Sequence, residues 1–192
     1  SMRDYAMRII NKESSIALQK SMLVDMLNYG SVAQQRFGYG TDNLANSLLT
    51  EEQKGYASGE QEVSKKLTQG DKWAASNLIM ESNIRLLVAI RGLTADMTAK
   101  IEFTNHYGTK KSVDVLGSEF GTSGSMKYIE VNQLVIADAK QPITITVYNA
   151  DGTVYTVCQD SIEDYLARKD AGDTLVSAVM KFAYSAYAYL HK

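Results

Sequence analysis

The chain has 192 residues, of which 45% are hydrophobic and 22% are charged, and its formal net charge is −2. This composition is ordinary for a globular protein with a sizeable core. Because charges of both signs are interspersed, nucleic acid and anionic membrane are not favoured partners. No apolar run is long enough to span a membrane, so no membrane insertion is expected, and the single cysteine, Cys158, excludes an internal disulfide.

Capping and stop signals predict three helices in the first part of the chain. Ser1 and Asp4 form a Ser-x-x-Asp cap, in which the hydroxyl accepts from the third helical amide. After a short interruption, a longer helix is predicted to run to about Phe37, where two glycines follow as stop signals. A capping box at Thr50 predicts a third, short helix, and residues 58–72 are expected to be mostly loop.

From Trp73 onward the hydrophobic period changes from 3.6 to 2, which is typical of strands with one buried face. Turn signals separate the alternating segments, and a glycine-rich loop is expected at 117–125. The expected strands are 84–90, 98–104, 111–116, 128–131, 134–136, 143–147 and a partner of the last one. About seven short strands of this kind predict an antiparallel, immunoglobulin-like β-sandwich over about 72–158.

The last hairpin of this region has a recognisable turn. The sequence Asn-Ala-Asp-Gly ending at Gly152 suits a type I turn with the glycine in the left-handed position. This turn predicts that Val147 lies opposite Tyr155 and that Ile145 lies opposite Val157, with all four side chains on the core face.

An eight-residue signature occurs twice, as SMRDYAMR at residues 1–8 and as SIEDYLAR at residues 161–168. Each copy leads into an apolar stripe with the spacing of one buried helix face, and the two stripes correspond position for position. The stripes are Met22, Met26, Tyr29, Ala33 and Phe37 in the first copy and Leu175, Val179, Phe182, Ala186 and Leu190 in the second. We interpret the pattern as an internal repeat.

These elements predict an α+β protein with N-terminal helices, then the β-sandwich, then a closing helix that repeats the N-terminal one. Residues 1–60 are expected to form a helical segment, and residues 72–192 the sandwich with its closing helix at 161–190. Because the closing helix follows a sandwich strand, the repeat suggests that the opening helix also follows one. We therefore expect the helical segment to be the tail of a preceding β-domain in a longer protein.

Candidate reactive side chains are few, and each has an ordinary structural explanation. We interpret His106 as a polar turn residue, because no nucleophile motif accompanies it. Cys158 lacks a recognisable base and reads as an incidental thiol. Asp42, Asn43 and Asn46 could offer oxygen ligands to calcium, but their spacing is not that of an EF-hand loop. The sequence thus predicts no catalytic residues, no metal site and no cofactor.

Aromatic residues in the β region are the better lead to a ligand. Flat rings on the surface of a β-sandwich stack well on sugars. Trp73, Tyr107, Phe120 and Tyr128 lie in or beside the predicted sandwich and are the candidate binding residues. Trp73 begins a strand, however, and could equally close one end of the core.

The helical segment carries a resemblance in four blocks, at residues 23–30, 33–34, 37–39 and 41–46, which begin with Leu-Val-Asp-Met-Leu-Asn-Tyr-Gly. Here the chain resembles a module near the C-terminal ends of large secreted or wall-attached proteins of Gram-positive gut bacteria. In that family a helical segment precedes an immunoglobulin-like β region. The β region ends in a Ser-x-x-x-Tyr helix, which residues 161–165 match, and an apolar helix follows.

The resemblance implies location and context rather than chemistry. It implies an extracellular protein at the cell surface or in the cell wall, with its neighbouring domains as partners and with polysaccharide or peptidoglycan as a further candidate. It supplies no catalytic residues. We therefore expect a non-catalytic surface module with a structural or interaction role, and we keep a carbohydrate-binding module as the alternative. Exposure of Trp73 and a tyrosine on one face would favour the alternative.

Overall fold

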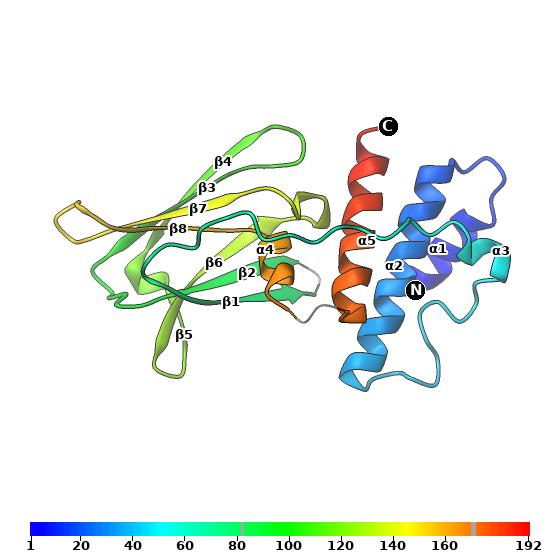
Figure 1. Ribbon diagram of the computed structural model, residues 1–192, viewed down its shortest axis with the longest axis horizontal. Helices are drawn as coiled ribbons and strands as arrows, with labels where there is room; N and C mark the ends of the chain where they lie inside the picture. Colours follow the sequence, from blue (N-terminus) through cyan, green and yellow to red (C-terminus); the bar gives the residue numbers. More distant parts are fainter. Residues whose placement is uncertain (82, 170–171) are drawn as a thin grey trace. The chain divides into compact units, whose positions relative to one another are not determined.

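The computed structural model describes residues 1–81, 83–169 and 172–192 and shows a mixed α+β protein (Figure 1). The predicted class, with helices before and after an antiparallel β region, is confirmed. The β region consists of two four-stranded antiparallel sheets.

The chain forms two compact units. A helical unit combines residues 1–63 with residues 169–192, and a β unit consists of residues 64–168. The predicted boundaries differ from these at the C-terminal end, because the sequence assigned all of 161–190 to the β region. The final helix instead belongs to the helical unit.

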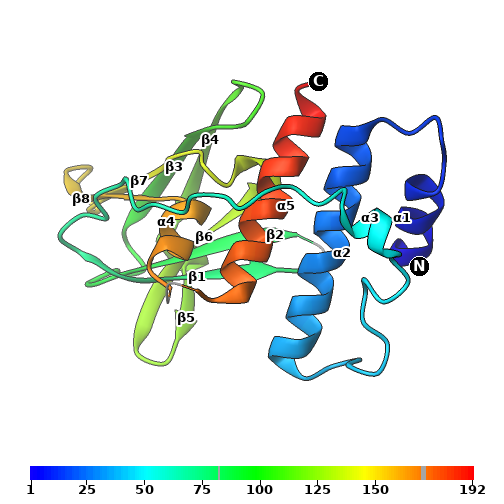
Figure 2. The same cartoon turned by 45° about the vertical axis from the view of Figure 1, so that its right-hand side comes forward.

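The helical unit contains α1 (Met2–Ile10), α2 (Ala17–Phe37), α3 (Glu51–Lys54) and α5 (Thr174–Leu190). Both views place α2 between α1 and α5 (Figures 1 and 2). The predicted caps are present: the Ser1 hydroxyl accepts from the Asp4 amide, and the Thr50 hydroxyl accepts from the Gln53 amide. Gly38 ends α2 with a φ of +70°, as the stop signals predicted.

One face of α2 packs against α1 and the segment before α3. The buried residues of this core are Ala6, Ile10, Leu23, Val24, Leu27 and Leu49. Partly buried methionines, among them Met22 and Met26, fill the space around it. The unbranched and polarizable methionine side chain suits such irregular gaps.

The other face of α2 packs against α5, and the two helices run in opposite directions (Figure 1). Tyr29 stacks on Phe182 with ring centroids 6.2 Å apart, and these are the two central positions of the predicted stripes. The predicted stripe fails at its end, because Phe37 is 68% exposed. Phe37 is the last residue of its helix, where no further turn remains to cover it.

The β unit contains strands β1 to β8, two 3₁₀ turns, η1 and η2, and the helix α4 (Ile162–Ala167). The strands are β1 (Trp73–Met80), β2 (Ile84–Ile90), β3 (Thr98–Thr104), β4 (Lys110–Leu116), β5 (Gly121–Ser123), β6 (Met126–Leu134), β7 (Ile143–Tyr148) and β8 (Val154–Asp160). The turns are η1 (Gly117–Glu119) and η2 (Ile136–Asp138). The predicted loop at 117–125 is therefore partly a short hairpin strand.

The strands form two sheets, one in the order β1-β2-β6-β5 and the other in the order β4-β3-β7-β8. The inward-facing residues of both sheets make the core, and the largest fully buried ones are branched aliphatic residues. They include Leu86, Val88, Ile90, Ile129, Val131, Ile143, Ile145 and Val147. The alternation in the sequence predicted the buried faces of β2, β3 and β7 correctly, since side chains of a strand point to opposite faces in turn.

The predicted register of the last hairpin is wrong by one residue. The observed pairs are Val147–Thr156 and Ile145–Cys158. A bulge next to Tyr148 leaves Tyr155 as an extra residue on β8. Because a one-residue slip turns every side chain to the other face, Val157 is exposed and Thr156 is buried.

The predicted closing helix is two helices. α4 is capped by Ser161, whose hydroxyl accepts from the Asp164 amide, and it ends after one and a half turns. α5 begins afresh after Asp173, whose carboxylate accepts from the Leu175 amide. Gly172, just before that cap, has a φ of +92°, a left-handed conformation that an uninterrupted helix cannot contain.

Candidate functional site

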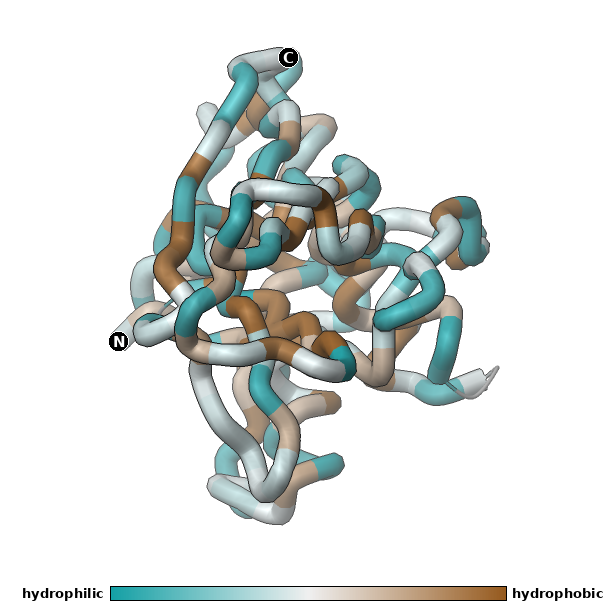
Figure 3. Tube along the Cα trace, turned by 90° about the vertical axis from the view of Figure 1, so that its left-hand side faces the viewer, coloured by the Kyte–Doolittle hydropathy of each residue, from teal (hydrophilic) through white to brown (hydrophobic). Residues whose placement is uncertain are grey.

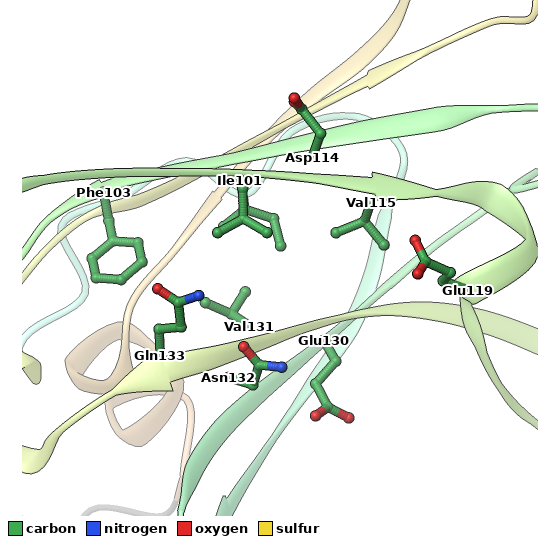
Figure 4. Close-up of a pocket in the computed structure, with 10 residues that line it drawn as sticks. Ile101, Phe103, Asp114, Val115, Glu119, Glu130, Val131, Asn132 and Gln133 are labelled. Atoms are coloured by element: carbon green, nitrogen blue, oxygen red, sulfur yellow. The ribbon is translucent and has the colours of Figure 1, made fainter.

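A cleft of about 370 Å³ opens between the two sheets of the β unit. Its walls are the edge strand β4 with its neighbour β3 on one side and β6 on the other (Figure 4). Within the described residues, β5 pairs with β6 only from Met126 to Tyr128. The remainder of that edge of β6 therefore borders the cleft with its backbone unpaired.

The floor of the cleft is apolar. Ile101 and Phe103 of β3, Val115 of β4 and Val131 of β6 point into the gap between the sheets (Figure 4). These positions are the inward-facing ones of their strands. Gln133 also points into the gap and adds an amide to its β6 side.

Acidic side chains flank the cleft. Asp114 and Glu130 lie on the outer faces of β4 and β6 and point away from the gap, while Glu119 stands at one end (Figure 4). Arg85 approaches Glu130 at 3.5 Å from the neighbouring strand β2, and the Glu119 carboxylate accepts from the Leu116 amide at 2.8 Å. Glu130 and Glu119 thus each have a partner within the β unit.

The four aromatic residues predicted from the sequence do not form one surface. Phe120 is buried, with 6% exposure, and Trp73 is half-buried with the Arg168 guanidinium 5.1 Å from its ring centroid. Tyr128 is half-buried on β6 and covers Gly121, where a Cβ would lie 2.2 Å from the ring. Tyr107 is exposed at the turn between β3 and β4.

His106 lies in the turn between β3 and β4, as predicted, and its side chain is buried. Its Nδ1 lies 2.6 Å from Asp138 Oδ1, and its backbone N–H donates to the same oxygen at 2.7 Å. The other oxygen of Asp138 accepts from the Val135 amide at 3.0 Å. The pair joins the β3–β4 turn to η2. Sequence reasoning missed it because the two residues are far apart in the chain.

A dense polar cluster surrounds α4, and sequence reasoning missed this as well. Arg168 donates to both carboxylate oxygens of the buried Asp160, at 2.8 and 3.0 Å, and to the Ser76 hydroxyl at 2.6 Å. The Asp164 carboxylate accepts from the backbone amides of Lys66 and Leu67 at 2.9 and 2.8 Å. The repeated signature was the available signal, because it contains both Asp164 and Arg168.

Three further residues considered from the sequence have local structural roles. Cys158 is buried in β8, and burial raises the pKa of its thiol, which lowers its reactivity at neutral pH. Asn43 and Asn46, considered as calcium ligands, bind side chains of the helical unit. Arg3 donates to the Asn43 amide oxygen at 2.5 Å, and Asn46 donates to Asn28 at 2.9 Å.

No protein-family model, curated protein or solved structure matches the chain. The resemblance to a surface module of Gram-positive gut bacteria therefore stays a prediction. The candidate binding site is therefore argued from the geometry of the cleft alone.

Hydrophobic residues occur in short stretches. Figure 3 shows brown segments interleaved with teal and white ones along the path of the chain. Across the described ranges, none of the helices has both the length and the hydropathy that crossing a membrane requires.

Proposed function

We propose that the protein is a non-catalytic interaction module and that its β unit binds a segment of another polypeptide in the cleft between β4 and β6. The observation that carries this proposal is the combination of an apolar floor with an unpaired strand edge. An unpaired edge offers a row of backbone donors and acceptors, which an extended peptide satisfies by adding a strand.

The pattern of side chains around the cleft defines the sequence that would fit. A segment lying beside β6 alternates its side chains between the gap and the outer face. Side chains that enter the gap meet Val115 and Val131 and would be apolar. Side chains on the outer face lie beside Glu130 and would be basic, since opposite charges on neighbouring strands attract. The ligand is thus an extended segment with alternating apolar and basic residues.

Synthetic peptides test this directly. A labelled peptide of alternating valine and lysine should bind the full chain in a fluorescence anisotropy titration, and one of alternating valine and glutamate should not. The substitution Glu130→Lys should weaken binding about fivefold, because a favourable surface charge pair of up to about 1 kcal/mol becomes repulsive.

The substitution Glu102→Lys is the matched control. Glu102 lies on the outer face of β3, is exposed and pairs with Lys100 at 3.0 Å, so its reversal changes charge without touching the cleft. Equal affinity for both peptides, or equal weakening by the control, would show that any binding is non-specific. NMR amide shifts at 113–115 and 130–133 should report the bound position.

The wider context of the module is also part of the proposal. The orders β1-β2-β6-β5 and β4-β3-β7-β8 agree with the ABED and CFG sheets of an immunoglobulin-like domain with one strand added beside C, which supports the immunoglobulin-like assignment. The resemblance to surface proteins supports a place in a multi-domain protein at the cell surface or in the cell wall. Detection of the parent protein on intact cells with a specific antibody would test the location.

A second candidate function is carbohydrate binding, and it rests on Tyr107. Its side chain is 59% exposed, beside the His106 ring at a centroid distance of 4.0 Å, so it offers an accessible aromatic face for a sugar. A pull-down on insoluble polysaccharides and on peptidoglycan tests this candidate. Retention that is lost in Tyr107→Ala or Tyr128→Ala would favour it over peptide binding.

A further inference from the structure

The signature that occurs twice in the sequence forms a helix both times, but its side chains have different surroundings in α1 and α4. In both helices the serine is the cap and accepts from the amide of the aspartate. The side chains of the aspartate, the tyrosine and the arginine are identical in the two copies, and methionine in α1 replaces isoleucine in α4.

In α4 these four positions hold the helix against the edge of a β-sandwich. Ile162 is buried, and Asp164 accepts from two consecutive backbone amides of the segment before β1. The Tyr165 hydroxyl lies 3.4 Å from the Asn77 side chain on β1. Arg168 is bonded to the buried Asp160 at the end of β8 and lies over the Trp73 ring.

In α1 the same positions face solvent. Met2 is 68% exposed and Tyr5 is 48% exposed, and Asp4 and Arg8 are exposed as well. Within the described residues Arg8 pairs with no carboxylate, and its guanidinium lies 5.5 Å from the Tyr5 ring centroid. The four side chains form what we call the α1 face.

The opposite side of α1 is already used. Ala6 and Ile10 are buried in the core of the helical unit, and Arg3 donates to Asn43. Arg3 and Ala6 correspond to Glu163 and Leu166 of α4, and both already contact other residues of the helical unit. The α1 face remains available without any disturbance of that core.

We propose that the α1 face binds the edge of a second β-sandwich domain, as α4 binds the edge of the β unit. The partner is defined by chemistry: a buried carboxylate at a strand end for Arg8, two consecutive backbone N–H groups for Asp4, a side-chain amide for Tyr5 and an apolar pocket for Met2. In a second copy of this chain the equivalent place is filled by its own α4. The occupant is therefore a different β domain with a vacant edge of this kind.

A tandem protein tests the proposal. Residues 64–160 are placed directly before Ser1 of the full chain, so that the added Asp160 precedes Ser1 as the native one precedes Ser161. The added sandwich should fold with α1 in the place of α4. The double substitution Tyr5→Ala with Arg8→Ala should then lower the unfolding midpoint of the added sandwich by about 5–10 °C, while it leaves the midpoint of the parent chain unchanged.

The matched control is a tandem in which the added segment is residues 64–168, so that the added sandwich keeps its own α4 before Ser1. An added sandwich that folds in the control but not with α1, or one that is indifferent to the double substitution, overturns the proposal. Sedimentation of the parent chain should show a monomer. A dimer that is lost on Tyr5→Ala with Arg8→Ala would overturn the assignment to a different domain and make a second copy the occupant.

If neither tandem folds, a measurement on the full chain still tests the proposal. A chain with Ile162, Asp164, Tyr165 and Arg168 all replaced by alanine lacks the four side chains that hold α4 at its edge, and mixing this opened chain with the wild-type chain should give a heterodimer by light scattering. A chain whose only substitutions are Tyr5→Ala and Arg8→Ala should form no heterodimer with the opened chain. Absence of any heterodimer while the opened chain keeps its circular dichroism overturns the proposal. Because the α1 face and the cleft are separate surfaces, failure here leaves the peptide titrations unaffected.

Discussion

α1 and α4 begin with the same capping residues and carry the same aspartate, tyrosine and arginine, yet they are held in place by different forces. α1 is held by apolar contacts of Ala6 and Ile10 with α2, and its Asp4 and Arg8 are exposed. α4 buries its charged residues and bonds them to strands and to the segment before β1. A local motif therefore determines that a helix forms, and the surface it meets determines which side chains carry the stability.

The largest difference between the two helices is expected at their arginines. Arg168→Ala leaves the buried Asp160 without its partner, and an uncompensated buried charge costs about 3–5 kcal/mol. Arg8→Ala removes an exposed side chain and should cost less than about 0.5 kcal/mol. Urea unfolding followed by circular dichroism measures both. Equal losses for the two variants would contradict the contrast between the helices.

The second comparison concerns the apolar positions of α2. Leu27 is buried between α1 and α2, so Leu27→Ala should cost about 2–5 kcal/mol through lost burial and the cavity that remains. Phe37 belonged to the predicted stripe but is exposed, and Phe37→Asp should change stability by about 0.5 kcal/mol or less. Thermal unfolding of each variant distinguishes them. A large loss in Phe37→Asp would mean that the end of α2 is covered after all.

A smaller effect is expected at the aspartates of the two signatures. Asp164→Asn weakens two charge-assisted hydrogen bonds from backbone amides, at a cost of about 1.5–3 kcal/mol. Asp4→Asn alters an exposed first-turn residue whose partners are the Ser1 ammonium and hydroxyl, and it should change stability much less because solvent screens these contacts. The measurement is chemical unfolding at neutral pH. Hydrogen exchange at the Lys66 and Leu67 amides should also accelerate in Asp164→Asn and stay unchanged in Asp4→Asn.

The smallest expected effect is a pH dependence in the helical unit. Hydrogen bonds from Lys181 and Ser177 of α5 lower the pKa of the exposed Glu60 below its ordinary value of 4.5. A depressed carboxyl pKa adds stability above the unfolded pKa, and this contribution is lost as the pH falls through the folded pKa. Glu60→Gln should therefore lower the melting temperature slightly at pH 7 and not at pH 3. A difference that persists at low pH would exclude the carboxylate as its cause.

Much of the architecture could be predicted from the sequence, because it depends on local physics. The caps at Ser1, Thr50 and Ser161 satisfy amides within one helical turn, so their residues alone reveal them. The strand faces follow from strict alternation, which is a property of each segment by itself. The site was less predictable: of the aromatic candidates, Phe120 is buried and Trp73 is partly covered by Arg168, and residue type does not report either.

The sequence by itself determined the helix caps at Ser1, Thr50 and Ser161, most of the strands, and which face of most strands is apolar. Tertiary structure alone decided the one-residue bulge in β8, the assignment of α5 to the helical unit, and the pairing of His106 with Asp138 and of Arg168 with Asp160. The physical reason is the distance along the chain between the residues that interact. Hydrogen bonds of a cap or the period of a strand act between neighbours in the chain, whereas a buried charge pair forms only after distant segments have met.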